Sequence, residues 1–381
     1  MLIGVPQETF ASERRVALVP ITVTQLKKAT IEVVVQSGAG LAAGYPDASY
    51  ADAGATIQVA RAQVFALADV ILMVRALGAN PTGWHADMAL THAGQTIIAT
   101  MDALTSPELA GEAAKRQVTT YALDLVPRIT RAQAMDVLSS QANLAGYKAV
   151  IIAASTLPKI LPMLMTAAGT ITPARILVVG AGVAGLQAIA TARRLGGVVS
   201  AYDVRPAAKE QVESLGGRFV QLPLAAEGAQ DAGGYAKALG PEFYARQAEL
   251  MGGVVADSDV VITTAAVPGQ KAPVLITRAM VERMQPGSVV VDIAAERGGN
   301  CELTRPGESF VHQDVTIIGP LNIPSSLAYH ASQLYARNIT TFLLNMVKDG
   351  ELQPDPADEI VCDTRLTLDG NIVHTRLKGQ S

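Results

Sequence analysis

The sequence is poor in charged residues, aromatic rings and cysteine. Only 17% of its 381 residues are Asp, Glu, Lys or Arg, against about 25% in an average domain, and 4% are aromatic. The 30 basic and 34 acidic side chains form no basic cluster, which excludes a nucleic-acid-binding surface because phosphate contacts need grouped Lys and Arg. Two cysteines, Cys301 and Cys362, are too few for a disulfide framework, and no His or Cys lies at ligand spacing, so we expect no bound metal.

No apolar run is long and uninterrupted enough for a membrane span, which needs roughly 18 residues. The longest candidate, residues 149–168, contains Lys159, Pro158 and Pro162, and we interpret it as a buried helix. The N-terminal MLIGVPQETF lacks a basic segment followed by a long apolar one. These features predict a cytoplasmic protein without direct membrane insertion, and the length suggests two domains at about 150 residues each.

The N-terminal half alternates β-branched runs with amphipathic segments. Such alternation favours a parallel sheet covered by helices on both faces. No glycine-rich loop follows any of these strands, so this half predicts a Rossmann-like domain without its own dinucleotide. The expected strands are 2–5, 31–38, 69–74, 95–101 and 118–124, and the expected helices are 23–29 and 107–116.

The second half contains the motif G-A-G-V-A-G at residues 180–185 in a specific context. A β-rich run precedes it, an apolar helix opens on it, and the next strand ends at Asp203, 18 residues beyond Gly185. Gly180 allows a tight turn, Gly182 lets the backbone approach a pyrophosphate, and Gly185 permits close helix packing. The helix N-terminus then offers N–H groups to the phosphates. The motif therefore predicts a dinucleotide site.

Asp203 predicts which dinucleotide binds. Its carboxylate is expected to accept hydrogen bonds from the adenosine ribose hydroxyls and to repel a 2′-phosphate, which favours NAD(H) over NADP(H). Arg205, two residues later, is the counter-argument, since a guanidinium accommodates a 2′-phosphate.

We therefore predict an α/β protein of two Rossmann-like doubly wound parallel-sheet domains, the second carrying the dinucleotide site. Residues 1–135 with 327–381 form the first domain, and residues 136–326 form the second. A long helix from Arg131 connects them, a helix over 333–348 returns to the first domain, and residues 225–240 form a mobile lid loop. Further strands are expected at 217–222, 259–263, 288–292 and 315–318, with a β-like tail at 360–375.

Polar residues cluster where the two domains are predicted to connect: Arg128, Gln133, Asp136 and Ser139. They form either an N-capped, salt-bridged helix start or a group that meets the nicotinamide end of a bound dinucleotide. Tyr235, preceded by two glycines, is either an exposed loop aromatic or a lid residue over the nucleotide.

Several strings carry a family resemblance, among them PRITRAQAMDVLSSQANLAGY, MTAAGTITPARILVVGAGVAGLQAIATARRLG, DVRPAAKEQVESLGG, GGYAKALG and MQPGSVVVDIAAERGGN. Together they resemble the NAD(H)-binding component, domain I, of proton-translocating nicotinamide nucleotide transhydrogenase. The alanine dehydrogenases share the fold and the ERRVALVP-like start but less of the middle.

The resemblance implies a homodimer that binds NAD(H) and passes hydride to NADP⁺ on a partner component. Membrane-spanning subunits couple this Si/Re-stereospecific reaction to proton translocation, so the chain acts only with its partners and lies peripheral to the inner membrane. It also implies that Gln133 lies between the two nicotinamides, while Arg128, Asp136 and Ser139 position the dihydronicotinamide and Tyr235 belongs to a mobile loop. The implied cofactor contacts are Arg128, Ile129, Gln133, Gly180, Gly182, Val183, Ala184, Gly185, Asp203, Val204, Arg205, Gly234, Tyr235, Ala265 and Ala266.

Two other functions stay open. An amino-acid dehydrogenase needs a titratable group for its amine and imine chemistry, and alanine dehydrogenases carry a lysine, a histidine and an aspartate. At the positions that correspond to this lysine, histidine and aspartate, this chain has Met73, Thr100 and Glu296. Of the residues that alanine dehydrogenases use at this site, only Arg15 is retained. An NAD(H)-sensing module without catalysis has the same binding residues and cannot be separated by sequence.

Overall fold

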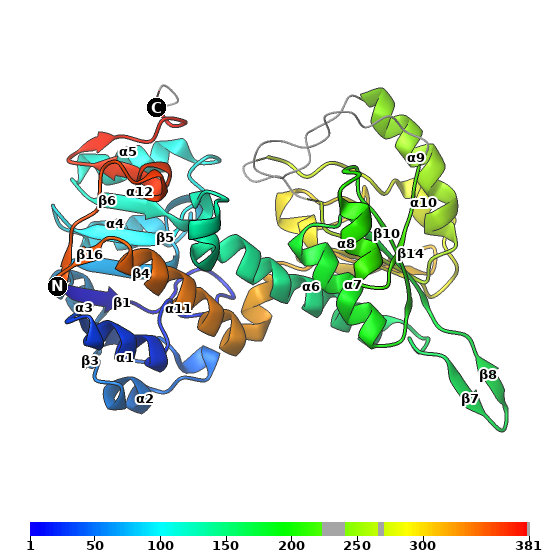
Figure 1. The fold of residues 1–381 in the computed structure, drawn as a ribbon, viewed down its shortest axis with the longest axis horizontal. Coiled ribbons are helices and arrows are strands. Elements are labelled where there is room, and N and C mark those ends of the chain that lie inside the picture. Colours follow the sequence, from blue (N-terminus) through cyan, green and yellow to red (C-terminus); the bar gives the residue numbers. More distant parts are fainter. Residues whose placement is uncertain (223–240, 266–269, 379–381) are drawn as a thin grey trace. The chain divides into compact units, whose positions relative to one another are not determined.

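The computed structural model describes residues 1–222, 241–265 and 270–378. They form two compact units, residues 1–141 with 325–381 (unit 1) and residues 142–324 (unit 2). Each unit is a central sheet with helices against it (Figure 1). The predicted lid loop lies outside the described residues, as do Gly234, Tyr235 and Ala266.

Unit 1 contains an eight-stranded sheet in the order β19-β18-β6-β5-β4-β1-β2-β3. Strands β1 to β6 are parallel, whereas β18 and β19, which lie in the β-like tail expected at 360–375, add an antiparallel edge. The strands are β1 (Leu2–Val5), β2 (Glu32–Gln36), β3 (Thr56–Gln58), β4 (Val70–Arg75), β5 (Thr96–Thr100), β6 (Thr119–Ala122), β18 (Arg365–Leu368) and β19 (Asn371–Ile372).

Both faces of this sheet are buried. Alternate residues of β4 pack into two different hydrophobic clusters, Leu72 with α1 and α11 and Ile71 with α3, α4 and α5. Near-continuous apolar strands are the consequence of this double burial. The helices are α1 (Pro20–Lys28), α2 (Asp47–Asp52), α3 (Arg61–Leu67), α4 (Trp84–Leu90), α5 (Pro107–Lys115), α11 (Ala328–Leu344) and α12 (Glu359–Thr364).

Unit 2 contains a seven-stranded sheet in the order β11-β10-β9-β12-β13-β15-β14, with β14 antiparallel at its edge. The strand order reverses at β9, so the crevice at its carboxyl end is the expected ligand position of such a sheet. The predicted fold class is confirmed. The strands are β9 (Arg175–Val179), β10 (Val198–Tyr202), β11 (Arg218–Phe219), β12 (Val260–Thr263), β13 (Val289–Asp292), β14 (Ser309–His312) and β15 (Val315–Ile318).

The helices of unit 2 include α7 (Val183–Arg194), α8 (Ala208–Ser214), α9 (Pro241–Ala256) and α10 (Arg278–Val281). The connecting helix α6 (Val137–Thr156) begins in unit 1 and ends in unit 2. Among the described helices, none combines the length and hydropathy of a membrane span.

The prediction of a buried helix over residues 149–168 is wrong beyond Thr156. Helix α6 ends at Thr156, and β7 (Leu164–Thr166) and β8 (Gly169–Ile171) form a hairpin instead. Pro158 and Pro162 explain the break, because proline removes a helical N–H and clashes with the preceding turn. The hairpin projects from unit 2 (Figure 1), and Met165 is 74% exposed.

The long helix predicted from Arg131 also begins later than expected. Residues Thr130–Met135 form a 3₁₀-helix, η4, and α6 starts at Val137. The Asp136 carboxylate separates the two elements by accepting hydrogen bonds from the backbone N–H (2.8 Å) and hydroxyl (2.6 Å) of Ser139. A capping carboxylate is a common helix start.

Two glycines allow a matched test of packing. A Cβ at Gly146 of α6 would lie 2.0 Å from the carbonyl oxygen of Ala184 in α7, whereas a Cβ at Gly111 of α5 meets nothing within 4 Å. Gly146→Ala should therefore destabilise the protein by about 1–3 kcal/mol through overpacking. Gly111→Ala should stabilise it by about 0.5–1 kcal/mol because alanine is the better helix former. Urea unfolding checks both; equal effects at the two positions would contradict the close helix crossing.

Candidate functional site

The glycine motif forms a turn that fits only glycine at two positions. Gly180 has a φ of +96°, and a Cβ on Gly185 would lie 1.8 Å from the carbonyl oxygen of Gly180. The Thr264 hydroxyl donates to that same carbonyl at 2.9 Å and fixes the turn against β12. At Gly182 a Cβ would meet nothing within 4 Å, and no side chain caps α7 there. The turn thus leaves the helix N-terminus, with Val183 and Ala184 in its first turn, accessible to an anion.

Asp203 follows β10 beside this turn. One carboxylate oxygen accepts the backbone N–H of Ala181 at 2.8 Å and Nη2 of Arg205 at 2.9 Å. The other oxygen accepts the backbone N–H and Nε of Arg205 at 2.8 and 2.9 Å. Hydrogen bonding to Asp203 raises the pKa of Arg205 above its ordinary value. The two predicted residues therefore lie together, with the guanidinium on the carboxylate that is expected to bind ribose.

A buried polar network supports the loop after β12, and no sequence motif marks it. The Asn300 amide accepts the N–H of Ala265 at 2.9 Å and donates to the carbonyls of Ala265 and Pro273, both at 2.8 Å. The Asp292 carboxylate in turn accepts the backbone N–H of Asn300 at 2.7 Å. Both side chains are fully buried, so the network rigidly places Ala265 at the carboxyl edge of the sheet.

Gln247 in α9 is a second residue that the sequence did not reveal. It is 1% exposed, yet its amide nitrogen and oxygen find no hydrogen-bond partner among the described residues. It lies one turn before Met251, which packs with Val179 and Tyr202 on the sheet. Helix α9 leads directly into the parallel strand β12. The start of α9 therefore lies at the carboxyl edge of the unit 2 sheet, where dinucleotides bind in such folds.

These features of unit 2 fit a bound dinucleotide. A buried amide without a partner costs about 1–3 kcal/mol unless a ligand, water or another protein group satisfies it, and the amide of Gln247 has no partner among the described residues. The open space at Gly182 and the uncapped start of α7 add a position for a pyrophosphate. Val204, beside Asp203, is partly buried against the same core as Tyr202. Phosphate, ribose and amide positions therefore lie along one edge of the sheet.

The polar cluster of unit 1 is presented by η4. Gln133 and Arg128 are exposed, whereas Ala132 and Met135 are buried in the core and Ile129 packs against it. Asp136 and Ser139 are hydrogen-bonded to each other at the start of α6. Asp136 thus caps the start of α6 through Ser139, whereas the side chains of Gln133 and Arg128 are exposed.

A buried charge cluster lies where the carboxyl ends of β1 and β4 meet. The Glu13 carboxylate accepts hydrogen bonds from Nε and Nη2 of Arg15, at 2.8 and 2.7 Å. It also accepts a hydrogen bond from Nε of Arg75 at 3.0 Å. Nη1 of Arg15 donates to the Gln141 amide at 3.0 Å. Although burial disfavours its charge, the two guanidinium groups lower the pKa of Glu13 to about 2. Arg15 is therefore bound by protein groups on all its nitrogens.

Arg75 is a further member of this cluster that the comparison with amino-acid dehydrogenases did not single out. It is the basic side chain at the end of β4, whereas Met73 is fully buried in the core. The Thr100 hydroxyl donates to the Val74 carbonyl, and Glu296 accepts the backbone N–H of Asn322. Among the described residues, no three His, Cys, Asp or Glu side chains form a group suited to a metal ion.

Two family models match this chain. The N-terminal domain of alanine dehydrogenase/PNT matches residues 4–145, and the C-terminal domain matches residues 149–375. The chain belongs to the alanine dehydrogenase/PNT family. The resemblance drawn from its motifs is therefore confirmed.

Individual relatives narrow the assignment within the family. The chain is 48% identical over 383 residues to an NAD(P) transhydrogenase alpha-subunit chain of Rhodospirillum rubrum, covering 100% of both. A solved transhydrogenase structure from Sinorhizobium meliloti matches with a TM-score of 0.85 and 45% identity, covering 98% of this chain and 99% of that one. An L-alanine dehydrogenase structure matches with a TM-score of 0.81 over 99% of this chain and 98% of its own length, but at 24% identity it shows the fold alone. The chain is thus a homologue of transhydrogenase alpha subunits.

The charge cluster predicts a specific pH dependence of stability. Glu8 accepts the N–H groups of Val74 and Arg75 at 2.6 and 3.2 Å, and burial followed by the nearby Glu13 charge raises its pKa to about 8. Since this pKa lies above that of the unfolded chain, the native state holds an extra proton between about pH 5 and 8, and stability falls as pH rises there. Glu8→Gln should flatten this decline in urea unfolding; a slope equal to that of the wild type would contradict the buried proton.

Proposed function

We propose that the chain is the NAD(H)-binding subunit of a proton-translocating transhydrogenase and that it passes hydride from NADH to NADP⁺ bound on a partner component. One observation carries the proposal: a glycine turn that fits a dinucleotide lies in a chain that matches transhydrogenase alpha subunits over its full length. The proposal extends to Si/Re stereospecificity and to activity only in the presence of the partner subunits.

Unit 2 supplies most of the binding residues in this proposal. The N-terminus of α7 takes the pyrophosphate, and the ribose hydroxyls replace the Arg205 guanidinium on Asp203. The Gln247 amide forms hydrogen bonds with the nucleotide. The backbone of Ala265, which Asn300 holds in place, also contacts the nucleotide. The remaining proposed contacts are Arg128, Ile129, Gln133, Val183, Ala184 and Val204, together with Gly234, Tyr235 and Ala266 outside the described residues.

Hydride transfer between two nicotinamides needs no titrating general acid or base among the proposed catalytic residues. One C–H bond breaks and another forms without release of a proton at the reacting carbons, so alignment matters more than a general acid or base. In this proposal Gln133 lies between the two rings, and Arg128, Asp136 and Ser139 position the dihydronicotinamide and its ribose. The exposure of Gln133 on η4 supports a role at a surface that meets the partner.

The proposed partners are the NADP(H)-binding component and membrane-spanning transhydrogenase subunits. Through them the chain is placed at the cytoplasmic side of the inner membrane as a peripheral subunit, and its hydride transfer is coupled to proton translocation. The relatives' designation as subunits supports the existence of partners.

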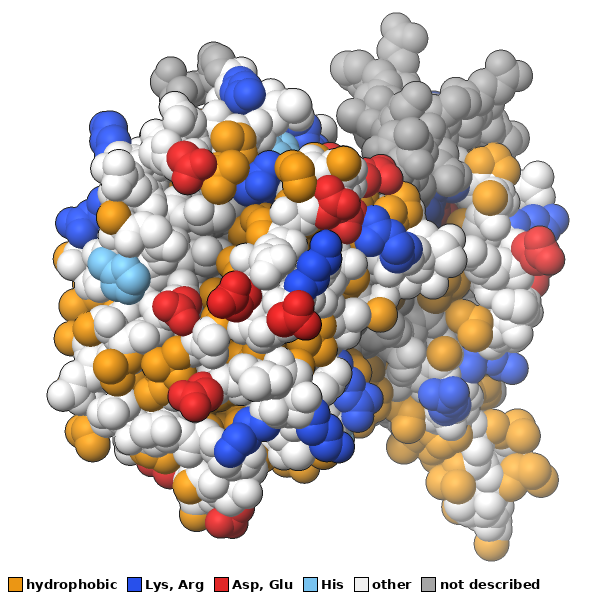
Figure 2. Space-filling view, turned by 60° about the vertical axis from the view of Figure 1, so that its left-hand side comes forward, with side chains coloured by type: hydrophobic (Ala, Val, Ile, Leu, Met, Phe, Trp, Pro, Cys, Tyr) orange, Lys and Arg blue, Asp and Glu red, His pale blue; other side chains and the backbone are white. Residues whose placement is uncertain are grey.

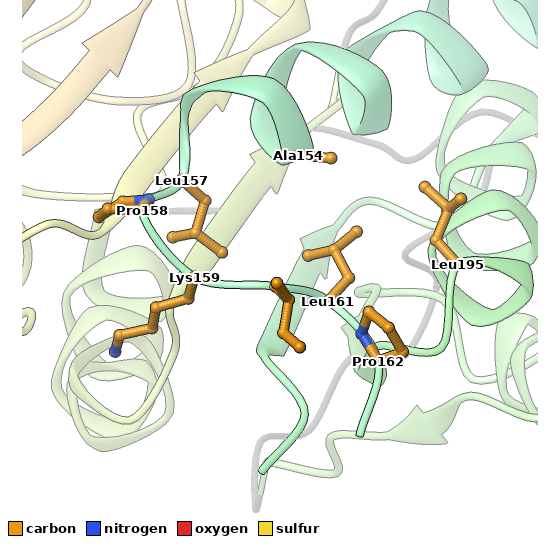
Figure 3. A pocket seen from close by; sticks show the side chains of 8 residues that line it. Ala154, Leu157, Pro158, Lys159, Leu161, Pro162 and Leu195 are labelled. Carbon is orange, nitrogen blue, oxygen red and sulfur yellow. The ribbon is translucent and has the colours of Figure 1, made fainter. Parts of the chain in front are cut away.

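We further propose a homodimer, which the β7–β8 hairpin supports. Its exposed apolar side chains include Met163, Leu164, Met165 and Ile171, and apolar atoms gather on the protrusion at the lower right of Figure 2. At its base lies a mainly apolar groove of about 590 Å³ (Figure 3), lined by Ala154, Leu157, Pro158, Lys159, Ile160, Leu161, Pro162 and Leu195. A projecting apolar element beside an apolar groove favours burial against a second copy.

The function is tested by mixing the purified chain with NADH and the NADP⁺-loaded partner component. We expect NADPH to form, and Gln133→Ala to slow transfer by about tenfold or more while the NADH affinity, measured by fluorescence titration, changes less than about twofold. Absence of transfer with alanine-dependent NAD⁺ reduction by the chain alone indicates an amino-acid dehydrogenase. Binding without either reaction indicates a sensing module, and equal losses of rate and affinity argue against a role of Gln133 between the rings.

The dimer is tested by placing a charge on the hairpin. Met165→Glu should convert the protein to a monomer in sedimentation experiments, because a carboxylate is costly to bury in an apolar interface. Val59→Glu is the matched control, since Val59 is 82% exposed but lies in unit 1, and it should leave the dimer intact. A dimer that persists in Met165→Glu would rule out the hairpin as the interface.

A further inference from the structure

The loop that carries Gln133 is a short 3₁₀-helix, an element with poor hydrogen-bond geometry of its own. Within it, Ala132 and Met135 are buried, whereas Gln133 and Ala134 are exposed. The two buried residues fix the depth of the loop in the core. They do not by themselves fix the direction in which the exposed side chain of Gln133 leaves the loop, and two further contacts hold the loop on either side of it.

The first contact comes from Asn338 in the middle of α11. Its Nδ2 donates to the carbonyl oxygen of Ala134 at 2.8 Å, and the residue is 8% exposed. Its Oδ1 is buried and finds no partner among the described residues. A buried amide of which one end is left unpaired costs stability, so this asparagine is poorly explained by packing alone. Its hydrogen bond holds the residue directly after Gln133.

The second contact lies two residues before Gln133. Arg131 forms an ion pair with both carboxylate oxygens of Asp358, one of them at 3.1 Å, and also donates to Asn345 Oδ1 at 3.2 Å. Asn345 donates to the same carboxylate at 2.9 Å, and Asp358 also caps α12 through the N–H of Ile360 at 2.9 Å. Hydrogen bonding to Arg131 lowers the pKa of Asp358 to about 2. Arg131 is 52% exposed, and exposed pairs contribute little stability, which leaves orientation of the loop as the main effect.

We propose that Asn338 and Asp358 are positioning residues for hydride transfer, which hold the loop on both sides of Gln133 and thereby set the direction of its side chain. The inference rests on the proposed function of Gln133. It assigns a role to the C-terminal segment, residues 325–381, which supplies Asn338, Asn345 and Asp358. The segment therefore does more than complete the core of unit 1.

The test is a double-mutant comparison in the full chain with the NADP⁺-loaded partner. Asn338→Leu keeps a similar volume and removes the hydrogen bond to Ala134. We expect the rate at saturating NADH and partner to fall about tenfold, because small misplacements of a reacting group are costly, with NADH affinity within about twofold of the wild type. In the Gln133→Ala background, Asn338→Leu should have no further effect on the rate, since it acts through Gln133.

A second variant and a control complete the design. Asp358→Asn keeps the cap of α12 but loses the ion pair with Arg131. It should lower the rate less than Asn338→Leu does, and this loss should also vanish in the Gln133→Ala background. If Asn338→Leu does not fold, Asp358→Asn provides the test. Arg337→Leu, at an exposed position beside Asn338, should leave the rate unchanged. Equal losses in both backgrounds, or parallel losses of rate and NADH affinity, overturn the inference. A wild-type chain that transfers no hydride refutes the proposed function and the inference with it.

Discussion

The tightest constraint in the proposed dinucleotide site is the approach of α7 to the end of β9. The carbonyl oxygen of Gly180 occupies the space that any side chain at Gly185 would need, 1.8 Å from an ideal Cβ. This contact sets the angle of α7 and thus the direction of its N-terminal N–H groups. The same turn receives the Thr264 hydroxyl and places Ala181 against Asp203. The proposed phosphate, ribose and loop positions therefore all depend on one backbone contact.

The low charge content is a consequence of the two parallel sheets, whose strands are buried on both faces. The charges that are buried are compensated locally. Glu13 binds both Arg15 and Arg75, and Glu8 keeps its proton near neutral pH beside it. An amino-acid carboxylate would have to displace Glu13 from Arg15, a large cost for a buried pair. The geometry thus favours a structural role for this cluster.

Several elements could be predicted because their signals are local. The strand, the three glycines and Asp203 follow one another in a fixed order, and β-branched runs mark most of the parallel strands. The region 149–168 was predicted wrongly because its composition suits a buried helix as well as an exposed apolar hairpin, and only Pro158 and Pro162 argued against the helix. The roles of Gln247, Asn300 and Asn338 could not be predicted, because a single polar residue in an apolar pattern cannot be distinguished by sequence from a solvent-exposed one.

The sequence by itself determined the fold class, the position of the glycine turn and the family, because backbone conformation and strand burial are encoded in neighbouring residues. The tertiary structure decided which distant groups meet: Asn300 on Ala265, and Asn338 on the loop of Gln133. Such contacts join segments up to 204 residues apart. Their partners are chosen by the packing of whole helices and strands, which no local pattern records.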